Sequence, residues 1–363
     1  MSTNRRKFLA GASAAAAVAA PYVALGQKKY DDGASDTEIK IGHICPYSGP
    51  ASAYGVNGKA IVAYFEMINA TGGINGRRIR LISLDDGYSP PKTVELMRQL
   101  VEQEKVLCTH NTLGTATNTA VHKYMNQKKV PHLYLATGAS KWGDYKHFPW
   151  TMGYQPDYHT EGSIYARHIL ATVKDPKIAV LMQNDDYGKD YWEGFKEGLG
   201  KQANLVVKHV TYEINEPTVD SQVIQLKASG ANVFFNIATP KFAAQAMRKV
   251  ADLGWKPVHY VNNVSASVGT VMKPAGFENA QGIMTASYLM DATDKQWADH
   301  PEMKAWSAWM DKYLPGANKA DANYVYAYAV SFLMTETLKR CGNELTRANL
   351  MKQAASFQKF RVP

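Results

Sequence analysis

The sequence has few cysteines and no cysteine pattern. Only three occur in 363 residues, and they lie far apart, at Cys45, Cys108 and Cys341. Their odd number and wide spacing exclude a disulfide framework, and they form no C-x-x-C pair and no metal-ligand spacing. We therefore expect buried structural thiols, with no metal ion and no cofactor.

Short catalytic and nucleotide-binding motifs are also missing. The chain has no HExxH, no GxSxG, no P-loop and no GxGxxG. Paired carboxylates at 85–86 and 185–186 follow predicted strands, where they are expected to cap the next helix. Three histidines, His43, His110 and His132, have no assignable nucleophile or carboxylate partner. We expect no enzyme, although a Ser/His/Asp arrangement, and hence a secreted hydrolase, stays open as an alternative.

Basic clusters and long apolar runs are lacking as well. The formal net charge is +9, but Lys and Arg are scattered. Without a basic run, a zinc finger or an RNA-binding motif, a nucleic-acid partner is not expected. After the first 27 residues no stretch is long and apolar enough to span a membrane.

Residues 1–27 have the order of an export signal, with positive charge first and an Ala-rich apolar region after it. Residues 3–9, TNRRKFL, resemble the twin-arginine motif, which implies bacterial export in a folded state. We expect cleavage near 24–27, no lipid anchor, and a soluble mature protein in the periplasm. The polar segment Lys28–Asp36 is expected to be disordered.

The stretch Ile39–Gly55, IKIGHICPYSGPASAYG, predicts a buried strand, a turn and a helix start with Ser52 as N-cap. Strands and helices then alternate, which predicts an α/β fold with parallel sheets. Further strands are expected at about 78–85, 106–110, 131–136, 177–183, 205–211, 233–237, 258–261 and 281–287. Helices are expected at about 53–70, 91–104, 115–128, 158–173, 188–201, 218–229, 239–253, 299–313, 321–341 and 345–357.

A weak internal repeat suggests two similar lobes. A strand, a loop, a Tyr-Gly pair and a helix occur first at Tyr54-Gly55 and again at Tyr187-Gly188. Two such lobes facing each other would leave a cleft, which is a usual place for a small ligand. Chance could also supply two such pairs.

Two loops of the first lobe have the chemistry of an anion site. Asn111–Thr115 and Thr137–Ser140 are small, hydroxyl-rich and glycine-bearing. Gly114 and Gly138 let the backbone approach a ligand closely, and free N–H groups at helix starts favour a carboxylate. Plain helix capping explains either loop alone. Aromatic residues in or near the predicted loops could pack on an apolar ligand body. They are Tyr54, Trp142, Tyr154 and Tyr187.

In order and spacing these segments resemble the periplasmic branched-chain amino-acid (Leu/Ile/Val) binding proteins of ABC transporters. The resemblance rests on IKIGHICPYSGPASAYG, GGINGR, the strand ending LDDG, ATGAS and NDDYG, and it covers nearly all of 37–340. It implies the type I periplasmic-binding fold, two Rossmann-like lobes joined by a hinge. The implied parts are 37–154 plus 284–340 (lobe 1), 156–282 (lobe 2) and a C-terminal helix at 341–363. Relatives usually continue with a further crossover segment, and we expect it to be missing after Pro363.

The resemblance also implies which residues meet the ligand. The ligand carboxylate would meet the backbone of Leu113 and Gly114 and the second loop, and tyrosines would close both sides. Asn263 takes the place of the family's acidic partner of the ligand ammonium, and Thr239 takes the place of another tyrosine. The expected site comprises Tyr54, Leu113, Gly114, Thr137, Gly138, Ala139, Ser140, Tyr187, Thr239 and Asn263.

These departures argue against a plain α-amino acid, because a buried ammonium without its carboxylate is costly. They fit an aromatic carboxylate or a neutral amide. We therefore expect a monomeric solute-binding protein that delivers a small carboxylate-bearing ligand, either a hydrophobic amino acid or an aromatic acid, to the permease subunits of an ABC importer. A ligand-sensing receptor or regulator on the same fold is the alternative.

Overall fold

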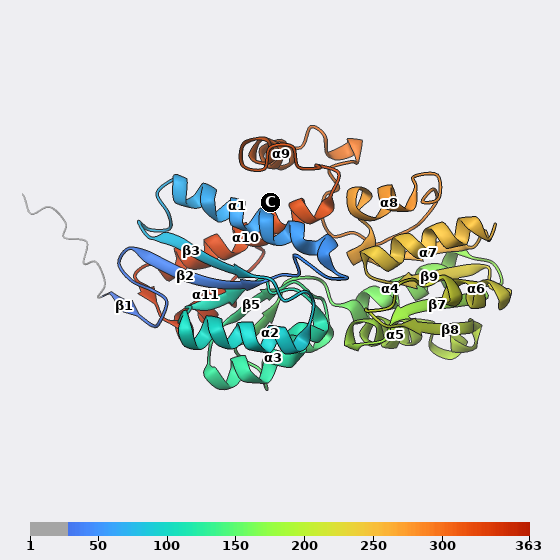
Figure 1. Ribbon diagram of the computed structural model, residues 1–363, viewed down its shortest axis with the longest axis horizontal. Coiled ribbons are helices and arrows are strands. Elements are labelled where there is room, and N and C mark those ends of the chain that lie inside the picture. Colours follow the sequence, from blue (N-terminus) through green and yellow to red (C-terminus); the bar gives the residue numbers. More distant parts are fainter. Residues whose placement is uncertain (1–27) are drawn as a thin grey trace, which may run out of the picture.

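The computed structural model describes residues 28–363, so the expected export signal at 1–27 lies outside the described residues (Figure 1). The first of the two large parallel sheets has the strand order β3-β2-β4-β5-β6. Its strands are β2 (Glu38–Ile44), β3 (Arg78–Leu84), β4 (Cys108–His110), β5 (His132–Leu135) and β6 (Thr151–Gly153). Ile39 and Ile41 on β2 are fully buried, as expected for a strand with helices on both faces of its sheet.

Helices cover both faces of this first sheet. In Figure 1, α1 and α10 lie on one face, and α2 and α3 lie on the other. The helices are α1 (Gly55–Ala70), α2 (Pro90–Arg98), α3 (Thr115–Lys128), α9 (Pro301–Tyr313), α10 (Ala322–Cys341) and α11 (Arg347–Ala354). One apolar core joins β2 to side chains of α9, α10 and α11, so these C-terminal helices belong to the first lobe.

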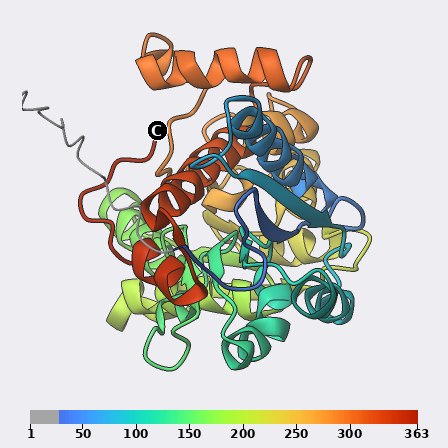
Figure 2. The same cartoon turned by 90° about the vertical axis from the view of Figure 1, so that its left-hand side faces the viewer.

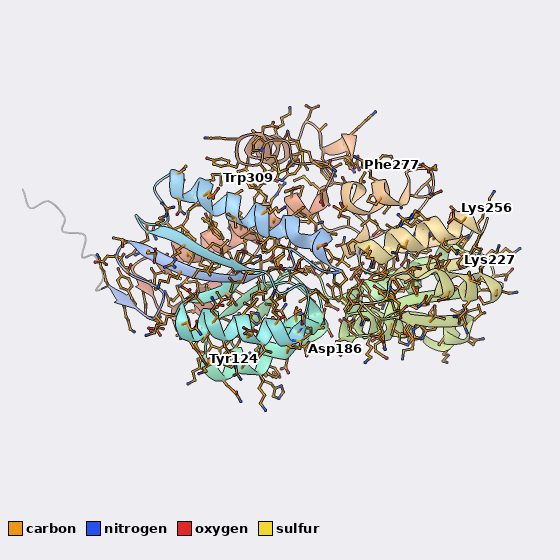
Figure 3. All side chains as sticks on the ribbon, in the orientation of Figure 1. Tyr124, Asp186, Lys227, Lys256, Phe277 and Trp309 are labelled. Atoms are coloured by element: carbon orange, nitrogen blue, oxygen red, sulfur yellow. The ribbon has the colours of Figure 1, made fainter. Side chains whose placement is uncertain are left out.

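The outermost helix of this lobe is α9, which Figure 2 shows apart from the sheet and above α10. Trp309 of α9 lies between α9 and α1 (Figure 3), and its ring centroid is 6.1 Å from that of Tyr64. Trp306 and Trp309 are both buried, which explains how a single amphipathic helix is held against the lobe.

The second lobe is built around a parallel sheet with the order β10-β9-β7-β8. Alternate residues of β7 point into two separate cores, one under α4 and α5 and one under α6 and α7. Its strands are β7 (Ile178–Gln183), β8 (Val206–Tyr212), β9 (Val233–Ile237) and β10 (Val258–Val261). Its helices are α4 (Tyr158–Thr172), α5 (Asp186–Leu199), α6 (Asp220–Ala228), α7 (Pro240–Asp252) and α8 (Lys273–Ala275).

The expected α/β class, with two parallel sheets in two lobes, is confirmed. The chain passes between the lobes after β6 and again between α8 and α9 (Figure 1). The residue at which each lobe ends stays a prediction. Short helical turns complete the fold, at η1 (Ser52–Tyr54), η2 (Gln99–Gln103), η3 (Ser140–Gly143), η4 (Gly200–Leu205), η5 (Asn263–Ser265), η6 (Val268–Met272) and η7 (Lys295–Trp297).

The expectation of disorder at Lys28–Asp36 is wrong. Residues Lys29–Tyr30 form strand β1, which pairs in parallel with β11 (Glu344–Leu345). The buried guanidinium of Arg77 donates a 2.7 Å hydrogen bond to the Tyr30 hydroxyl and lies 5.4 Å from the ring centroid of Tyr30. This cation–π contact and hydrogen bond hold in place a segment whose polar composition alone predicts disorder.

Two local expectations are also wrong. The segment 281–287 forms only a single bridge to β10, between Met284 and Tyr260, because the next free amide, that of Ala286, donates to the Tyr165 hydroxyl. Ser52 does not cap α1, since it lies in the turn η1 without a side-chain cap, and α1 begins at Gly55.

Buried histidines are a notable feature of both lobes. His43, His110 and His132 are fully buried in the first sheet, and His259 lies in the second. Burial lowers the pKa of His43 to about 4, although its Nδ1 lies 2.9 Å from the carbonyl oxygen of His110. Burial also lowers the pKa of His132 to about 3. No helix within 28–363 has the length and apolar character needed to cross a membrane.

Buried His43 predicts that acid destabilises the fold. Between pH 6.5 and about 4 the unfolded chain binds a proton at this residue and the folded chain does not, so stability falls as pH falls. His43 alone contributes about 1.4 kcal/mol per pH unit to this slope. In His43→Asn, which keeps a donor for the His110 carbonyl, the slope of unfolding free energy should decrease by that amount. Chemical denaturation across this pH range measures it, with exposed His147→Asn as control. An unchanged slope in His43→Asn would contradict the assignment.

Candidate ligand-binding site

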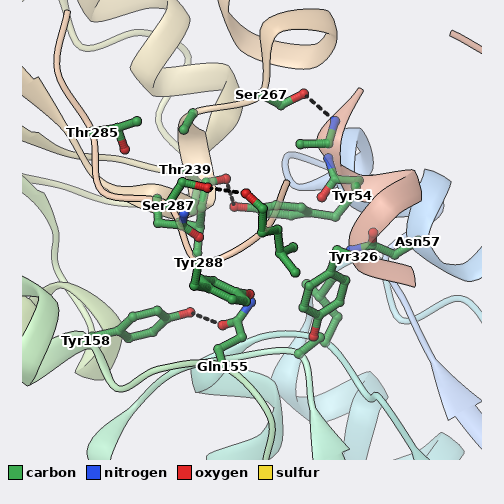
Figure 4. A pocket seen from close by; sticks show the side chains of 18 of the residues that line it. Tyr54, Asn57, Gln155, Tyr158, Thr239, Ser267, Thr285, Ser287, Tyr288 and Tyr326 are labelled. Carbon is green, nitrogen blue, oxygen red and sulfur yellow. Dashed lines mark hydrogen bonds between the residues drawn. The ribbon is translucent and has the colours of Figure 1, made fainter. Parts of the chain in front are cut away.

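The two sheets direct the carboxyl ends of their strands toward one cavity between the lobes. In the first lobe the cavity wall follows β2, β3, β4 and β5, and in the second it follows β7, β9 and β10. Residues beyond strand ends line such sites because the parallel arrangement brings all these loops to one edge. The start of α10 and the segment 285–294 close the remaining sides (Figure 4).

The cavity has a volume of about 310 Å³ and walls from both lobes. This volume is at the small end of the range for ligand pockets. Its first-lobe lining comprises Tyr54, Asn57, Tyr88, Leu113, Gly114, Thr115, Ala136, Gln155, Ala322, Asn323 and Tyr326. Its second-lobe and crossover lining comprises Tyr158, Tyr187, Thr239, Asn263, Val264, Ala266, Ser267, Thr285, Ser287, Tyr288, Leu289, Met290, Asp291 and Asp294.

The structure brings together six of the residues expected from the sequence. They are Tyr54, Leu113, Gly114, Tyr187, Thr239 and Asn263. The other four, Thr137, Gly138, Ala139 and Ser140, line a separate and more open depression beside the first crossover. Thr137 contacts one residue of the cavity wall, because its hydroxyl oxygen is 2.6 Å from that of Thr115.

The expected backbone contacts of Leu113 and Gly114 are not available to a ligand. The N–H of Leu113 donates to the carbonyl of Ile44 at 3.0 Å, and the N–H of Gly114 donates to that of Ala136 at 3.3 Å. Gly114 is required for another reason, since its φ is +103° and a Cβ there would lie 2.5 Å from the Tyr88 ring. The glycine therefore makes room for a tyrosine of the cavity wall.

Ser140 joins the lobes instead of facing the cavity. Its N–H and hydroxyl donate to the two carboxylate oxygens of Asp190 on α5, at 2.8 and 2.6 Å. The neighbouring Lys141 forms a 2.7 Å ion pair with Asp186, at the point where α5 meets the first lobe (Figure 3). We call these four residues the rim clasp.

A second set of contacts closes the opposite rim and the floor of the cavity. The Ser267 hydroxyl donates to Asp321 at 3.1 Å and accepts from the N–H of Ala322 at 3.2 Å. The Tyr54 hydroxyl donates across the cleft to the carbonyl of Val264 at 3.1 Å (Figure 4). The structure is therefore a closed form, in which side chains of one lobe are bonded to the other on both sides of the cavity.

The second-lobe residues predicted from the sequence are already engaged by neighbours. The Tyr187 hydroxyl accepts a hydrogen bond from the side-chain amide of Asn262. The Thr239 hydroxyl lies 3.1 Å from that of Tyr212, which is fully buried behind it. Asp185 caps α5 by accepting from the N–H groups of Tyr187 and Gly188, as expected for a carboxylate after a strand.

Asn263 is held from two sides. Its N–H donates to the buried carboxylate of Glu161 at 2.8 Å, and its side-chain Nδ2 donates to the carbonyl of Ala286 at 2.8 Å. Glu161 also accepts from the hydroxyls of Tyr191 and Tyr165, and burial raises its pKa. With one Nδ2 hydrogen engaged, Asn263 keeps its uncharged Oδ1 as an acceptor and the second Nδ2 hydrogen as a donor.

Sequence reasoning missed several cavity residues. Tyr326 and Asn323 come from the start of α10, some 270 residues after Tyr54 in the chain, so no local motif connects them. Asn57 lies in the first turn of α1, is 3% exposed, and could have been found as the next polar residue after the Tyr54-Gly55 pair. The sequence predicts only loops or helix starts, and no ligand contact, at three further wall residues, Tyr88, Gln155 and Tyr158.

The cavity wall is uncharged except for two aspartates. Six tyrosines line it, and no Lys, Arg or His does. Burial raises the pKa of Tyr54, Tyr187 and Tyr326 well above the usual value, so their hydroxyls stay protonated. Asp291 and Asp294 are the charged residues of the wall, and their carboxylates bind the local N–H groups of Thr293 and Gln296. No cluster of His, Cys, Asp or Glu suited to a metal ion occurs in the part of the chain that the structure describes.

Such a wall offers neutral hydrogen bonds and aromatic surface to a small ligand and contains no nucleophile activated by a base. Burial raises the pKa of the Cys45 thiol to about 12, which makes that residue unreactive. All three cysteines are free and buried, as expected from the sequence.

The family model and the similar known proteins all indicate the same protein family. A family model described as periplasmic binding protein matches residues 38–363. Leu/Ile/Val-binding protein homolog 7 of Brucella suis biovar 1 is 25% identical over 268 residues, 71% of this chain and 66% of the relative. The match thus spans just under two thirds of that relative's length. Homolog 3 of Brucella melitensis biotype 1 is 25% identical over 317 residues, 85% of this chain and 81% of the relative.

Solved structures show the same fold. The substrate-binding periplasmic protein of Ralstonia solanacearum superimposes with a TM-score of 0.81 at 22% identity, over 89% of this chain and 90% of that one. Together with the family match over nearly the whole described chain, the two lobes and the cavity between them lead to one conclusion: this chain belongs to the periplasmic binding protein family.

Proposed function

We propose that this protein is the periplasmic substrate-binding component of an ABC importer and that it captures a small carboxylate-bearing ligand between its lobes. The observation that carries the proposal is the cavity of about 310 Å³, whose walls come from both lobes. A ligand that touches both walls stabilises the closed form over the open one, which is how binding is converted into a change of shape. The permease would then recognise that closed shape.

The donors of the cavity support a carboxylate. Thr115 begins α3, a helix of 14 residues, and no acceptor for its N–H occurs among residues 28–363. An unpaired N–H at a helix start favours a negative group. The Thr115 hydroxyl adds a second donor when the Thr137 hydroxyl, 2.6 Å away, donates to it. The curated relatives named as Leu/Ile/Val-binding protein homologues support a ligand of this size and class.

The second wall argues against a bound ammonium. Asn263 offers a neutral oxygen, and the carboxylate behind it, that of Glu161, is already bonded to three donors. An ammonium ion beside Asn263 would meet a neutral amide in place of a carboxylate, which is costly for a buried charge. The two acids of the wall, Asp291 and Asp294, accept from local N–H groups. Six tyrosine rings instead favour a flat or branched apolar body. An aromatic or branched aliphatic acid therefore fits better than a plain α-amino acid.

Delivery without chemistry is the second part of the proposal. The ligand should be recovered unchanged after release, and the loaded protein should stimulate ATP hydrolysis by its permease in a reconstituted membrane. Turnover of the ligand by the protein alone would favour a hydrolase. Binding without any effect on a permease would favour a ligand-sensing receptor on the same fold.

A thermal-shift screen of the mature protein tests the ligand class. The set compares isocaproate with leucine and phenylacetate with phenylglycine, and in each pair the second compound has the same carbon skeleton plus an ammonium group. A ligand at about 100 times its Kd adds about 2.7 kcal/mol of stability, which gives a clear rise in Tm. The acids without the ammonium should give the larger shifts. Tighter binding of leucine than of isocaproate would contradict the role given to Asn263.

The rim clasp predicts a separate effect on affinity. Asp190→Ala removes both hydrogen bonds to Ser140, and we expect these bonds to be lost when the lobes open. Affinity should fall about fivefold for every ligand alike, because a partly exposed charged hydrogen bond contributes on the order of 1 kcal/mol. Titration calorimetry measures this, with Glu193→Ala, an exposed acid one turn along α5, as the matched control. Equal affinities of Asp190→Ala and the parent protein would show that the clasp does not favour closure.

A further inference from the structure

We propose that the hydroxyl group of Tyr326, oriented by Asn111, donates a hydrogen bond to the carboxylate of the ligand. This inference rests on the proposed function, since it assigns the residue that recognises the acid group. It replaces the backbone contacts of Leu113 and Gly114, whose N–H groups are already bonded within the first lobe.

The side-chain amide of Asn111 has a fixed orientation. Asn111 follows β4 and is fully buried, and its Nδ2 donates to the carbonyl of Tyr134 at 2.7 Å. A backbone carbonyl can only accept, so the nitrogen of the amide must face Tyr134. The second hydrogen of the same Nδ2 is donated to the Tyr326 hydroxyl oxygen at 2.8 Å. Asn111 has a φ of +51°, a conformation that asparagine tolerates better than most residues.

This bond determines what Tyr326 can offer to a ligand. Its oxygen accepts from Asn111, so its own hydrogen is left to be donated elsewhere. No acceptor for that hydrogen is found among residues 28–363. Tyr326 lines the cavity and is 5% exposed, and its ring is held edge-on against Tyr154 with centroids 5.5 Å apart. A buried hydroxyl hydrogen without an acceptor is costly, and a ligand oxygen removes that cost.

The position of this donor fits a carboxylate. Thr115, whose N–H has no acceptor among residues 28–363, is another residue of the cavity wall. Tyr326 and Thr115 thus supply neutral donors of the first lobe to a cavity whose wall contains no Lys, Arg or His. Hydrogen bonds from neutral donors to an ionised oxygen are about twice as strong as neutral ones. Because Tyr326 and Asn111 both belong to the first lobe, the acid group can dock before the second lobe closes.

The test uses two pairs of probes with one skeleton each, benzoate with benzamide and isocaproate with isocaproamide. Tyr326→Phe keeps the ring and removes only the hydroxyl. Titration calorimetry should show a loss of at least about tenfold in affinity for whichever acid binds, and a loss of about threefold or less for its amide. Tyr328→Phe, two residues along α10 and outside the cavity, is the control and should bind both as the parent protein does.

A second variant separates orientation from packing. In Asn111→Asp the buried carboxyl group has at most one hydrogen, which the Tyr134 carbonyl takes, and none is left for Tyr326. Tyr326 should then donate its hydrogen to residue 111 and lose its donor toward the ligand. The acid should bind as weakly as in Tyr326→Phe, and the double variant should show no further loss. Thermal unfolding without ligand reports whether each variant is folded.

The outcomes distinguish this inference from the proposed function. If an acid binds the parent protein and Tyr326→Phe binds it equally well, the role of Tyr326 is overturned while the proposed function stands. If neither acid binds the parent protein, the proposed ligand class and the role of Tyr326 are overturned together. A matched loss for acid and amide would show that Tyr326 contributes only shape, which also overturns the assignment.

Discussion

The geometry of this protein depends on two parallel sheets whose strands end at the same cavity. Parallel pairing sends every strand-to-helix loop to one edge of its sheet, so residues as distant in sequence as Tyr54, Leu113 and Thr239 meet there. Because each lobe has its own cores, the loops can carry polar and aromatic side chains without weakening the fold. The cavity is therefore the product of topology, and its chemistry depends on the loop residues.

That chemistry is almost entirely neutral. Tyrosine hydroxyls, asparagine amides and a helix start line the cavity, and the charged residues of its wall are Asp291 and Asp294. Other charged residues join the lobes, as in the contact between Ser140 and Asp190. Buried carboxylates such as Glu161 orient wall residues from behind. The ligand and the rim contacts therefore act separately on the equilibrium between the open and closed forms. The ligand determines specificity, and the rim contacts favour closure with any ligand.

The sequence predicts the fold well because buried strands, turns and helix starts are local signals. The two sheets, the Tyr-Gly pair of each lobe and the burial of all three cysteines follow from such signals. The site was predicted less completely, because its assignment needed side-chain partners. Ser140 looks like an anion ligand in sequence but binds Asp190, and Tyr326 carries no signal until α10 is placed beside β4 and β5. The strand β1 was missed because its stability comes from Arg77, which is distant in sequence.

The central claim is that a ligand in this cavity holds the two lobes closed. Spin labels at Lys123→Cys on α3 and Glu193→Cys on α5, both exposed, report the distance across the rim, and the native cysteines are buried and do not compete for label. Pulsed electron–electron double resonance measures the distance between the two labels. It should show a broad distribution that includes long distances in the ligand-free protein and a single short distance at saturating ligand. An identical distribution with and without a ligand that calorimetry shows to be bound would contradict the account.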